Sequence, residues 1–371
     1  MTATHYLLWF RRFALAAAAL AFVVIVLGAW VRLSTAGLGC PDWPGCYGHL
    51  TVDQAALNVE AINAAFPERP FEYQKAVKEM VHRYFASTLG LMILVLAGLA
   101  IANRKDPQQP VALPIALVAL VIFQGLLGMW TVTLLLKPLL VVLHLLGGLA
   151  TFALLAWLAM ERPRPALPRK TGTQHSVNEL ATAKTSTHGA SPSSPPPFHG
   201  GGDAASRSNN LRSLATAALL ILIIQIGLGG WTSSNYAALA CPDFPTCQNE
   251  WWPEMDVNDA FVLWRGLGID YEGGVLDHPA RVAIHFIHRL GAIAAALTLG
   301  FLSIAAWRRG ATPAIRIAGA VLGLVLVTQL ILGPVMVMRA LPLSLATAHN
   351  AVAALLLLAT VWLSHVIRRS E

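Results

Sequence analysis

Four histidines inside apolar segments are the residues of this sequence best suited to chemistry: His82, His144, His288 and His349. Each stands near the start of a run long enough to cross a membrane, where an ionisable side chain is costly and usually functional. Two neutral imidazoles facing each other across a helix bundle suit one haem iron, whereas copper or zinc would more often recruit a third ligand. A polar contact between helices explains one such histidine, but four at matched depth favour haem. We therefore expect His82 to face His144, and His288 to face His349, with a haem in each pair.

The residue three positions before a histidine differs between the two halves of the chain. Glu79 precedes His82 and His285 precedes His288, so each lies on roughly the same helix face as its histidine. A carboxylate held against a haem edge can act as a base or stabilise developing positive charge. The alternative for Glu79 is an ordinary solvated loop acid.

Arginines directly follow two of the histidines. Arg83 comes after His82, and Arg289 comes after His288. Their guanidinium groups can pair with haem propionates, or they can reach toward the outer lipid headgroups from the helix ends. The two roles are compatible, and the sequence leaves both open.

Two cysteine pairs repeat with the same spacing in long loops. Cys40-Pro-Asp-Trp-Pro-Gly-Cys46 returns as Cys241-Pro-Asp-Phe-Pro-Thr-Cys247, 201 residues later. The oxidising side of a membrane favours a disulfide within each pair, and the intervening prolines and aspartate favour a tight turn. The bonds are either structural staples or a redox-active relay.

These spacings identify a tandem duplication. The offset of 201 between the cysteine pairs becomes 206 from His82 to His288 and 205 from His144 to His349. The two halves have the same orientation, so the repeat is parallel rather than inverted. Between them lies a Pro/Gly/Ser-rich segment whose composition buries too little apolar surface to fold. We expect an N-terminal half over 1–161, a cytoplasmic linker over 162–210 and a C-terminal half over 211–371.

The composition of the chain is typical of an integral membrane protein. Hydrophobic residues make up 56% of the 371-residue chain and charged residues 12%, against about 25% charged in soluble domains. This excludes a soluble globular protein, a disordered chain and a nucleic-acid-binding domain. A helix needs about 20 apolar residues to cross the hydrocarbon core, and eight runs qualify: 12–31, 82–102, 111–133, 139–160, 211–231, 282–306, 313–337 and 343–366. The expected fold class is an all-α integral membrane protein, a bundle of eight transmembrane helices in two halves of four.

Positive charge marks one side of this bundle. The termini, the linker and the loops on their side carry 16 basic and 5 acidic residues, and the opposite loops carry 10 basic and 14 acidic. The positive-inside rule places both termini in the cytoplasm. The net charge of +7 therefore reflects topology rather than a nucleic-acid partner. Residues 1–11 lack the pattern of a transit peptide, which favours a bacterial inner membrane with the histidines and cysteines on its periplasmic side.

The sequence resembles the haem A synthase family, in its class with two cysteine pairs. The resemblance rests on Gly37-Leu-Gly-Cys-Pro-Asp-Trp-Pro44 and on Glu79-Met-Val-His82-Arg83. His144, His288-Arg289 and His349 complete the match. It spans both halves and fails only in the linker, which is unusually long for the family.

The resemblance implies an oxidoreductase that converts a porphyrin methyl of haem O to a formyl group through a hydroxymethyl intermediate, for cytochrome oxidase assembly. It implies a haem b cofactor on His288 and His349, and substrate haem on His82 and His144. The family's essential loop carboxylate falls on Glu79, so that half would do the chemistry and the other would relay electrons. Implied partners are the lipid bilayer, the farnesyltransferase that makes haem O, and a quinone or another electron acceptor.

Three other functions use parts of the same residue set. A di-haem transmembrane electron-transfer cytochrome would need all four histidines and no Glu79. A periplasmic thiol–disulfide relay would depend on the cysteines rather than on the histidines. A haem exporter would leave the porphyrin unchanged.

Overall fold

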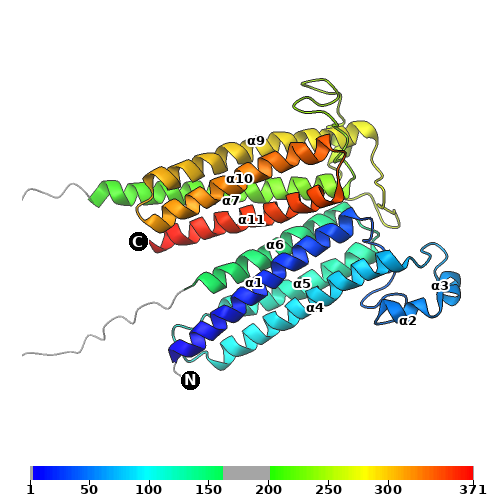
Figure 1. The fold of residues 1–371 in the computed structure, drawn as a ribbon, viewed down its shortest axis with the longest axis horizontal. Coiled ribbons are helices and arrows are strands. Elements are labelled where there is room, and N and C mark those ends of the chain that lie inside the picture. Colours follow the sequence, from blue (N-terminus) through cyan, green and yellow to red (C-terminus); the bar gives the residue numbers. More distant parts are fainter. Residues whose placement is uncertain (1–2, 162–200, 371) are drawn as a thin grey trace, which may run out of the picture.

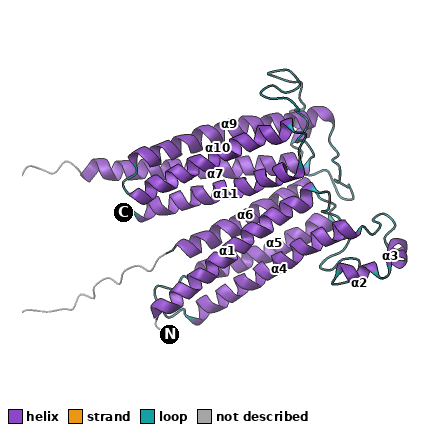
Figure 2. Ribbon diagram, in the orientation of Figure 1, coloured by secondary structure: helices purple, strands orange, loops and turns teal. Residues whose placement is uncertain are grey.

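The computed structural model describes residues 3–161 and 201–370, and this part of the chain is helical (Figures 1 and 2). Its helices, in chain order, are α1 (Ala3–Leu33), α2 (Val52–Ala56), α3 (Val59–Ala65), α4 (Tyr73–Ala102), α5 (Ala112–Thr133), α6 (Pro138–Met160), α7 (Gly201–Ser234), α8 (Val257–Ala260), α9 (His278–Arg309), α10 (Pro313–Met338) and α11 (Leu343–Arg369). The described residues contain no strand, only two isolated β-bridges in the cysteine loops.

Eight of the described helices are long and apolar enough to span a membrane, which confirms the number predicted from the apolar runs. The structure extends several of them beyond those runs. The helix α4 begins at Tyr73 and α9 at His278, well before the predicted starts at 82 and 282. A helix satisfies its backbone hydrogen bonds internally, so it can continue into polar sequence. This extension makes Glu79 a helical residue rather than a loop residue, whereas His285 already lay within the predicted run 282–306.

The spanning helices form two groups of four that lie side by side (Figure 1). In the first bundle α1 packs on α4 and α6, and α5 lies between α4 and α6. In the second bundle α9 packs on α7 and α10, and α11 lies between α10 and α7. The seam between the bundles joins α1 and α6 to α7 and α11, and a single buried apolar cluster runs through both groups.

The helix α7 begins earlier than the sequence predicted. We expected a linker up to residue 210, but α7 starts at Gly201, so the last part of that segment is helical. Its apolar portion still carries the membrane-spanning stretch, Asn209–Ser234. The rest of the predicted linker, 162–200, lies outside the described residues.

The loop of the second bundle between α8 and α9 crosses to the outer end of the first bundle (Figure 1). Arg69 of the first bundle forms ion pairs with Asp270 and, at 2.5 Å, with Glu272. Between these acids, Tyr271 is buried against Leu38 and its neighbours in the first bundle. The two bundles are thus held together by their loops as well as by the helix seam.

Lys137 strengthens this contact from the tight turn between α5 and α6. Its side chain is almost fully buried, its ammonium donates to the carbonyl of Gly266, and it lies 3.2 Å from the centre of the Trp264 ring. Burial lowers the pKa of Lys137 from its usual value. Among the described residues no ion pair forms at this lysine. The Gly266 carbonyl and the face of the Trp264 ring therefore take the place of the water that would solvate its ammonium group.

Candidate functional site

In the first bundle, His82 on α4 and His144 on α6 face the same interior, close enough for their imidazoles to interact electrostatically. Each ring rests against a glycine on a neighbouring helix. A Cβ added at Gly28 of α1 would lie 3.0 Å from His82 Cε1, and one added at Gly128 of α5 would lie 3.4 Å from His144 Cε1. The glycines therefore make the space that the two rings occupy.

The second bundle repeats this arrangement with His288 on α9 and His349 on α11, which also interact electrostatically. A Cβ at Gly229 of α7 would lie 3.2 Å from His288 Cε1, and one at Gly333 of α10 would lie 3.5 Å from His349 Cε1. Each bundle thus has two of the four histidines in its interior, and their pairing on one haem stays a prediction.

The residues of both pairs fit a bis-histidine haem iron. The Nδ1 atoms of His82, His144 and His349 are buried without a hydrogen-bond partner, so one polar atom of each of these rings is not satisfied by the described residues. Within the described residues, no three histidine, cysteine or acidic side chains gather into a metal cluster. Two imidazoles per site match the two axial positions of a haem rather than the three or four protein ligands of a zinc site.

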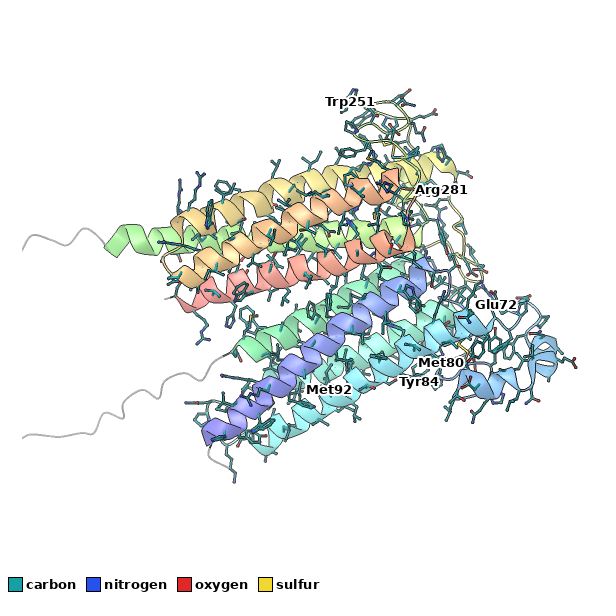
Figure 3. All side chains as sticks on the ribbon, in the orientation of Figure 1. Glu72, Met80, Tyr84, Met92, Trp251 and Arg281 are labelled. Atoms are coloured by element: carbon teal, nitrogen blue, oxygen red, sulfur yellow. A yellow bond between two sulfur atoms is a disulfide. The ribbon has the colours of Figure 1, made fainter. Side chains whose placement is uncertain are left out.

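Glu79 lies in α4 and is buried, with 4% of its surface exposed, so the alternative of a solvated loop acid is wrong. One carboxylate oxygen accepts a hydrogen bond from the backbone N–H of Cys40 at 2.9 Å. The other forms an ion pair with Arg83 at 2.5 Å. These contacts hold a charged acceptor one helical turn from His82. In Figure 3, the neighbouring Met80 and Glu72 lie at the end of α4 where the loops gather.

His285 occupies the equivalent place in the second bundle and is buried to the same degree, 4% exposed. Its Nδ1 lies 3.4 Å from the backbone nitrogen of Cys241, and its Nε2 lies 3.2 Å from Arg289 Nε, and a neutral imidazole accepts a hydrogen bond at one of these two nitrogens. The backbone partner and the arginine are therefore the same in kind as those of Glu79, and only the carboxylate is exchanged for an imidazole. At this position the two bundles therefore differ in charge but not in the kind of partner.

Arg83 and Arg289 bind the cysteine loops in this structure. Arg83 donates to the carbonyls of Asp42, Pro44 and Gly45, and Arg289 donates to carbonyls of the second loop at 2.7 to 2.8 Å. A propionate would have to share or displace these partners, so pairing with propionates stays a prediction. Their observed role is to fix each cysteine loop above its histidine.

Both predicted disulfides are formed. The Cα atoms are 4.8 Å apart in Cys40–Cys46 and 4.6 Å apart in Cys241–Cys247, and all four side chains are fully buried. Inside the first loop, the carboxylate of Asp42 accepts from the backbone N–H groups of two residues that follow the pair. Buried sulfur atoms are poorly accessible to an attacking thiolate, so the arrangement favours structural staples over a relay.

Asp243 organises the second cysteine loop in the same way. It accepts hydrogen bonds from the Thr246 hydroxyl and from the backbone N–H groups of Gln248 and Asn249. Burial raises the pKa of Asp243, but these hydrogen bonds outweigh burial and lower the pKa to about 2. Because folding lowers this pKa, the ionised carboxylate of Asp243 stabilises the folded loop at every pH above the ordinary pKa of a carboxyl group. This stabilisation is lost as the pH falls toward 2.

Asp243→Ala is expected to speed reduction of the Cys241–Cys247 bond at pH 7 at least tenfold. It removes three hydrogen bonds that are worth about 1 kcal/mol each. The measurement is alkylation and mass spectrometry after timed exposure to a phosphine reductant, which also works at low pH. Asp277→Ala is the control, because Asp277 is exposed and its side chain does not cap α9. Equal rates of reduction in the two variants would contradict the role of Asp243 in protecting this disulfide. A wild-type disulfide that is reduced faster at pH 5 than at pH 8 would contradict it as well.

Comparison with known proteins decides the family. The model of the COX15-CtaA family, described as cytochrome oxidase assembly protein, matches residues 11–361. The chain belongs to the COX15-CtaA family. Because the match runs through both bundles, it covers both histidine pairs and both cysteine loops.

Curated members of the family are similar over nearly their whole length. A protein named heme A synthase from Shewanella oneidensis is 40% identical over 346 residues, which are 93% of this chain and 92% of that protein. Proteins of the same name from Rhizorhabdus wittichii and Caulobacter vibrioides are 28% and 25% identical, over 94% and 95% of this chain and 91% and 94% of theirs. With its eight apolar helices, this COX15-CtaA chain is a multi-pass membrane protein.

The sequence reasoning missed two contacts of this COX15-CtaA chain, made by glutamines within apolar helices. Gln225 Nε2 lies 3.1 Å from His288 Nδ1 and 3.0 Å from the His288 carbonyl oxygen. Gln329 Nε2 lies 3.2 Å from His349 Nε2. An amide inside a membrane-length apolar run was the available signal, because such groups usually find a polar partner.

Gly229→Leu is expected to abolish haem binding in the second bundle. Its branched side chain would enter the space of His288, which already lies 3.2 Å from the position of a Cβ. The measurement is haem content per chain after purification. Gly98→Leu is the matched control, because nothing lies within 4 Å of a Cβ at that glycine. Wild-type haem content in the Gly229 variant would contradict the close approach.

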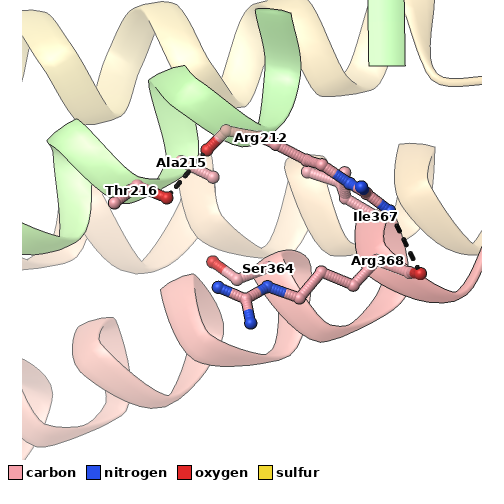
Figure 4. Close-up of a pocket in the computed structure, with 6 residues that line it drawn as sticks. All are labelled: Arg212, Ala215, Thr216, Ser364, Ile367 and Arg368. Carbon is pink, nitrogen blue, oxygen red and sulfur yellow. Dashed lines mark hydrogen bonds between the residues drawn. The ribbon is translucent and has the colours of Figure 1, made fainter. Parts of the chain in front are cut away.

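A cavity of about 410 Å³ lies at the far ends of α7 and α11, away from the histidines (Figure 4). Its lining residues are Arg212, Ala215, Thr216, Ser364, Ile367 and Arg368. Arg212 donates to the Arg368 carbonyl at 3.3 Å, and Thr216 donates to the Arg212 carbonyl at 3.0 Å. None of the predicted site residues of this COX15-CtaA chain lines this cavity.

Proposed function

We propose that this chain is a haem A synthase, which oxidises a methyl group of haem O to a formyl group through a hydroxymethyl intermediate. The observation that carries this proposal is a difference in charge between two similarly built sites. Both have a histidine pair, a glycine against each ring and an arginine-bound cysteine loop, but only the first has a buried carboxylate. The relatives that carry the name heme A synthase support the reaction.

The first bundle is the substrate site in this proposal, and the second holds a haem b cofactor. His82 and His144 would bind the iron of haem O, with Glu79 beside its porphyrin edge. His288 and His349 would hold haem b, which when bound supplies one-electron transfer. His285 fits this division, because an electron-transfer site needs no carboxylate base beside it.

Glu79 is the catalytic residue of the proposal. With water as the oxygen donor, conversion of a methyl to a formyl group removes four electrons in two steps and releases four protons, which a carboxylate can accept in turn. The Cys40 N–H and the Arg83 guanidinium fix both oxygens of this carboxylate, so it stays oriented when charge develops nearby. Electrons leave through the second bundle to a quinone or another acceptor.

The charge distribution supports an orientation for the chain. We infer a parallel tandem repeat whose termini and central linker lie in the cytoplasm of a bacterium, with the protein in its inner membrane. The cysteine loops and the histidine ends of α4 and α9 then face the periplasm, where disulfides form. The farnesyltransferase that produces haem O is the partner that this substrate requires.

Haem extraction from the purified protein, expressed beside a haem O source, tests the function. Chromatography should yield haem b together with haem A or its hydroxymethyl precursor. Haem b alone, at two per chain, would contradict the proposal and indicate a di-haem cytochrome. Absence of haem would contradict it as well, and would favour the thiol relay despite the burial of both disulfides.

A further inference from the structure

A side-chain amide holds a histidine in the second bundle but not in the first. Gln225 on α7 approaches His288 at its Nδ1, the ring nitrogen that a haem ligand does not use for iron, and also approaches its backbone carbonyl. The side chain has room because residue 291 is glycine, where an added Cβ would lie 2.3 Å from Gln225 Oε1. The amide is thus built into the contact between α7 and α9.

The first bundle has neither the glutamine nor the glycine at the equivalent positions. The repeat offset of 201 places Val24 at the position of Gln225, and the offset of 206 places Phe85 at the position of Gly291. Within residues 3–161 and 201–370, no side chain hydrogen-bonds to His82, and its Nδ1 is without a partner. His288 therefore has a side-chain hydrogen-bond partner that His82 lacks, although the glycine contacts of the two rings are alike.

The orientation of the His288 ring decides how firmly it can hold iron. A histidine that binds iron through Nε2 carries its proton on Nδ1 and is fixed by an acceptor at that atom. Gln225 carries such an acceptor, because its Oε1 is buried and makes no hydrogen bond in this structure. A half-turn of the carboxamide would bring Oε1 to Nδ1 and give up the hydrogen bond from Nε2 to the His288 carbonyl, an oxygen that can also accept within the α9 helix.

We propose that Gln225 is a positioning residue that makes the second bundle the site of the retained haem, and that Val24 leaves the first bundle able to exchange its haem. This inference rests on the proposed function. It explains how two sites with the same ligands can serve as a permanent cofactor site and a substrate site. A substrate must leave as product, so a less firmly fixed ligand suits the first bundle.

The reciprocal substitutions Gln225→Val and Val24→Gln test the proposal in the full-length protein. Haem transfer to excess apomyoglobin is followed by absorbance, and the low-spin electron paramagnetic resonance signal is recorded. Gln225→Val should speed haem loss about tenfold, the lower end of the range for partners of ligating histidines, and should shift the signal of the haem that remains. Val24→Gln should slow loss of haem from the first bundle.

Gln225→Glu separates positioning from packing. A carboxylate keeps the acceptor and the shape of the side chain, so this variant should retain haem and lower its midpoint potential. A merely structural role would leave the spectrum and the potential unchanged in both Gln225 variants. That result, or wild-type rates of haem loss in Gln225→Val, would overturn the proposal.

The haem content of the wild-type protein shows whether the proposed function or only the role of Gln225 has failed. Wild-type protein that holds no haem would refute the proposed function itself. Wild-type protein that holds haem which Gln225→Val does not loosen would refute only the role of Gln225.

Discussion

Replacing Glu79 by glutamine is expected to stop haem A formation while the protein still folds and retains haem b. The glutamine side chain has the same shape and keeps an oxygen for the Cys40 N–H, but it cannot accept a proton at neutral pH. A carboxylate that acts as a base in the transition state contributes about 10²- to 10⁴-fold to the rate. We therefore expect at least a hundredfold loss of haem A per unit of protein, measured by haem chromatography.

The structure explains why the fold should survive this change. Arg83 also donates to backbone carbonyls of the first cysteine loop, so it is not left as an isolated buried charge. Glu72→Gln is the matched control, because Glu72 lies just before α4, is exposed and pairs with Lys75. A Glu79→Gln protein with wild-type product formation would remove Glu79 from the mechanism. Loss of haem b in that variant would instead point to a structural role.

Alanine substitutions of His82 and His288 are expected to differ in their effect on haem b content, and both are expected to abolish haem A formation. His288→Ala removes one of the two residues proposed to hold haem b, so the purified protein should carry almost no haem b and make no haem A. His82→Ala should leave haem b close to one per chain, because the second bundle is intact, and should still abolish haem A. The measurements are haem content per chain and chromatography of the extracted haems.

A third histidine provides the control for both substitutions. His278 begins α9, the helix that carries His288, but it is exposed and pairs with Gln248 in the loop. His278→Ala should retain haem b and activity. If His82→Ala lost haem b and His288→Ala retained it, the assignment of substrate and cofactor bundles would be reversed. Equal, half-normal haem content in both variants would indicate the di-haem cytochrome.

The seam between the bundles bears on electron transfer from one site to the other. Arg32 at the end of α1 donates to the carbonyl of Ser233 at 2.9 Å and lies 4.3 Å from the centre of the Tyr236 ring. With the Arg69 ion pairs and the buried Tyr271, this contact ties the second bundle's loops to the first bundle. Such contacts hold the two histidine pairs at a fixed separation, as the proposed electron transfer between the bundles requires.

Several site predictions depended on helix boundaries, and these were the least accurate part of the sequence reasoning. Apolar runs locate the stretch within a membrane, but polar residues at either end can remain helical because their backbone groups bond within the helix. The run beginning at 82 therefore left Glu79 in a predicted loop, whereas α4 begins at Tyr73 and buries it. The same effect moved the start of α7 from residue 211 to Gly201.

The sequence by itself determined the eight membrane-length helices and the two disulfide pairings. These properties depend on the hydrophobicity and spacing of residues along the chain, which are local and additive. It also carried the residues that mark the family. The pairing of His82 with His144 and of His288 with His349 was inferred from two histidines per half at matched depth and near-constant repeat offsets, and their roles as ligands stay predictions.

Only the tertiary structure decided which polar groups contact one another. The burial of Glu79, the binding of Arg83 to loop carbonyls and the approach of Gln225 to His288 all depend on how each helix is rotated toward its neighbours. Rotation and crossing are set by the packing of many side chains from different helices, and no local pattern in the sequence encodes them. The difference between the two sites therefore became visible only when α1 and α7 were seen against α4 and α9.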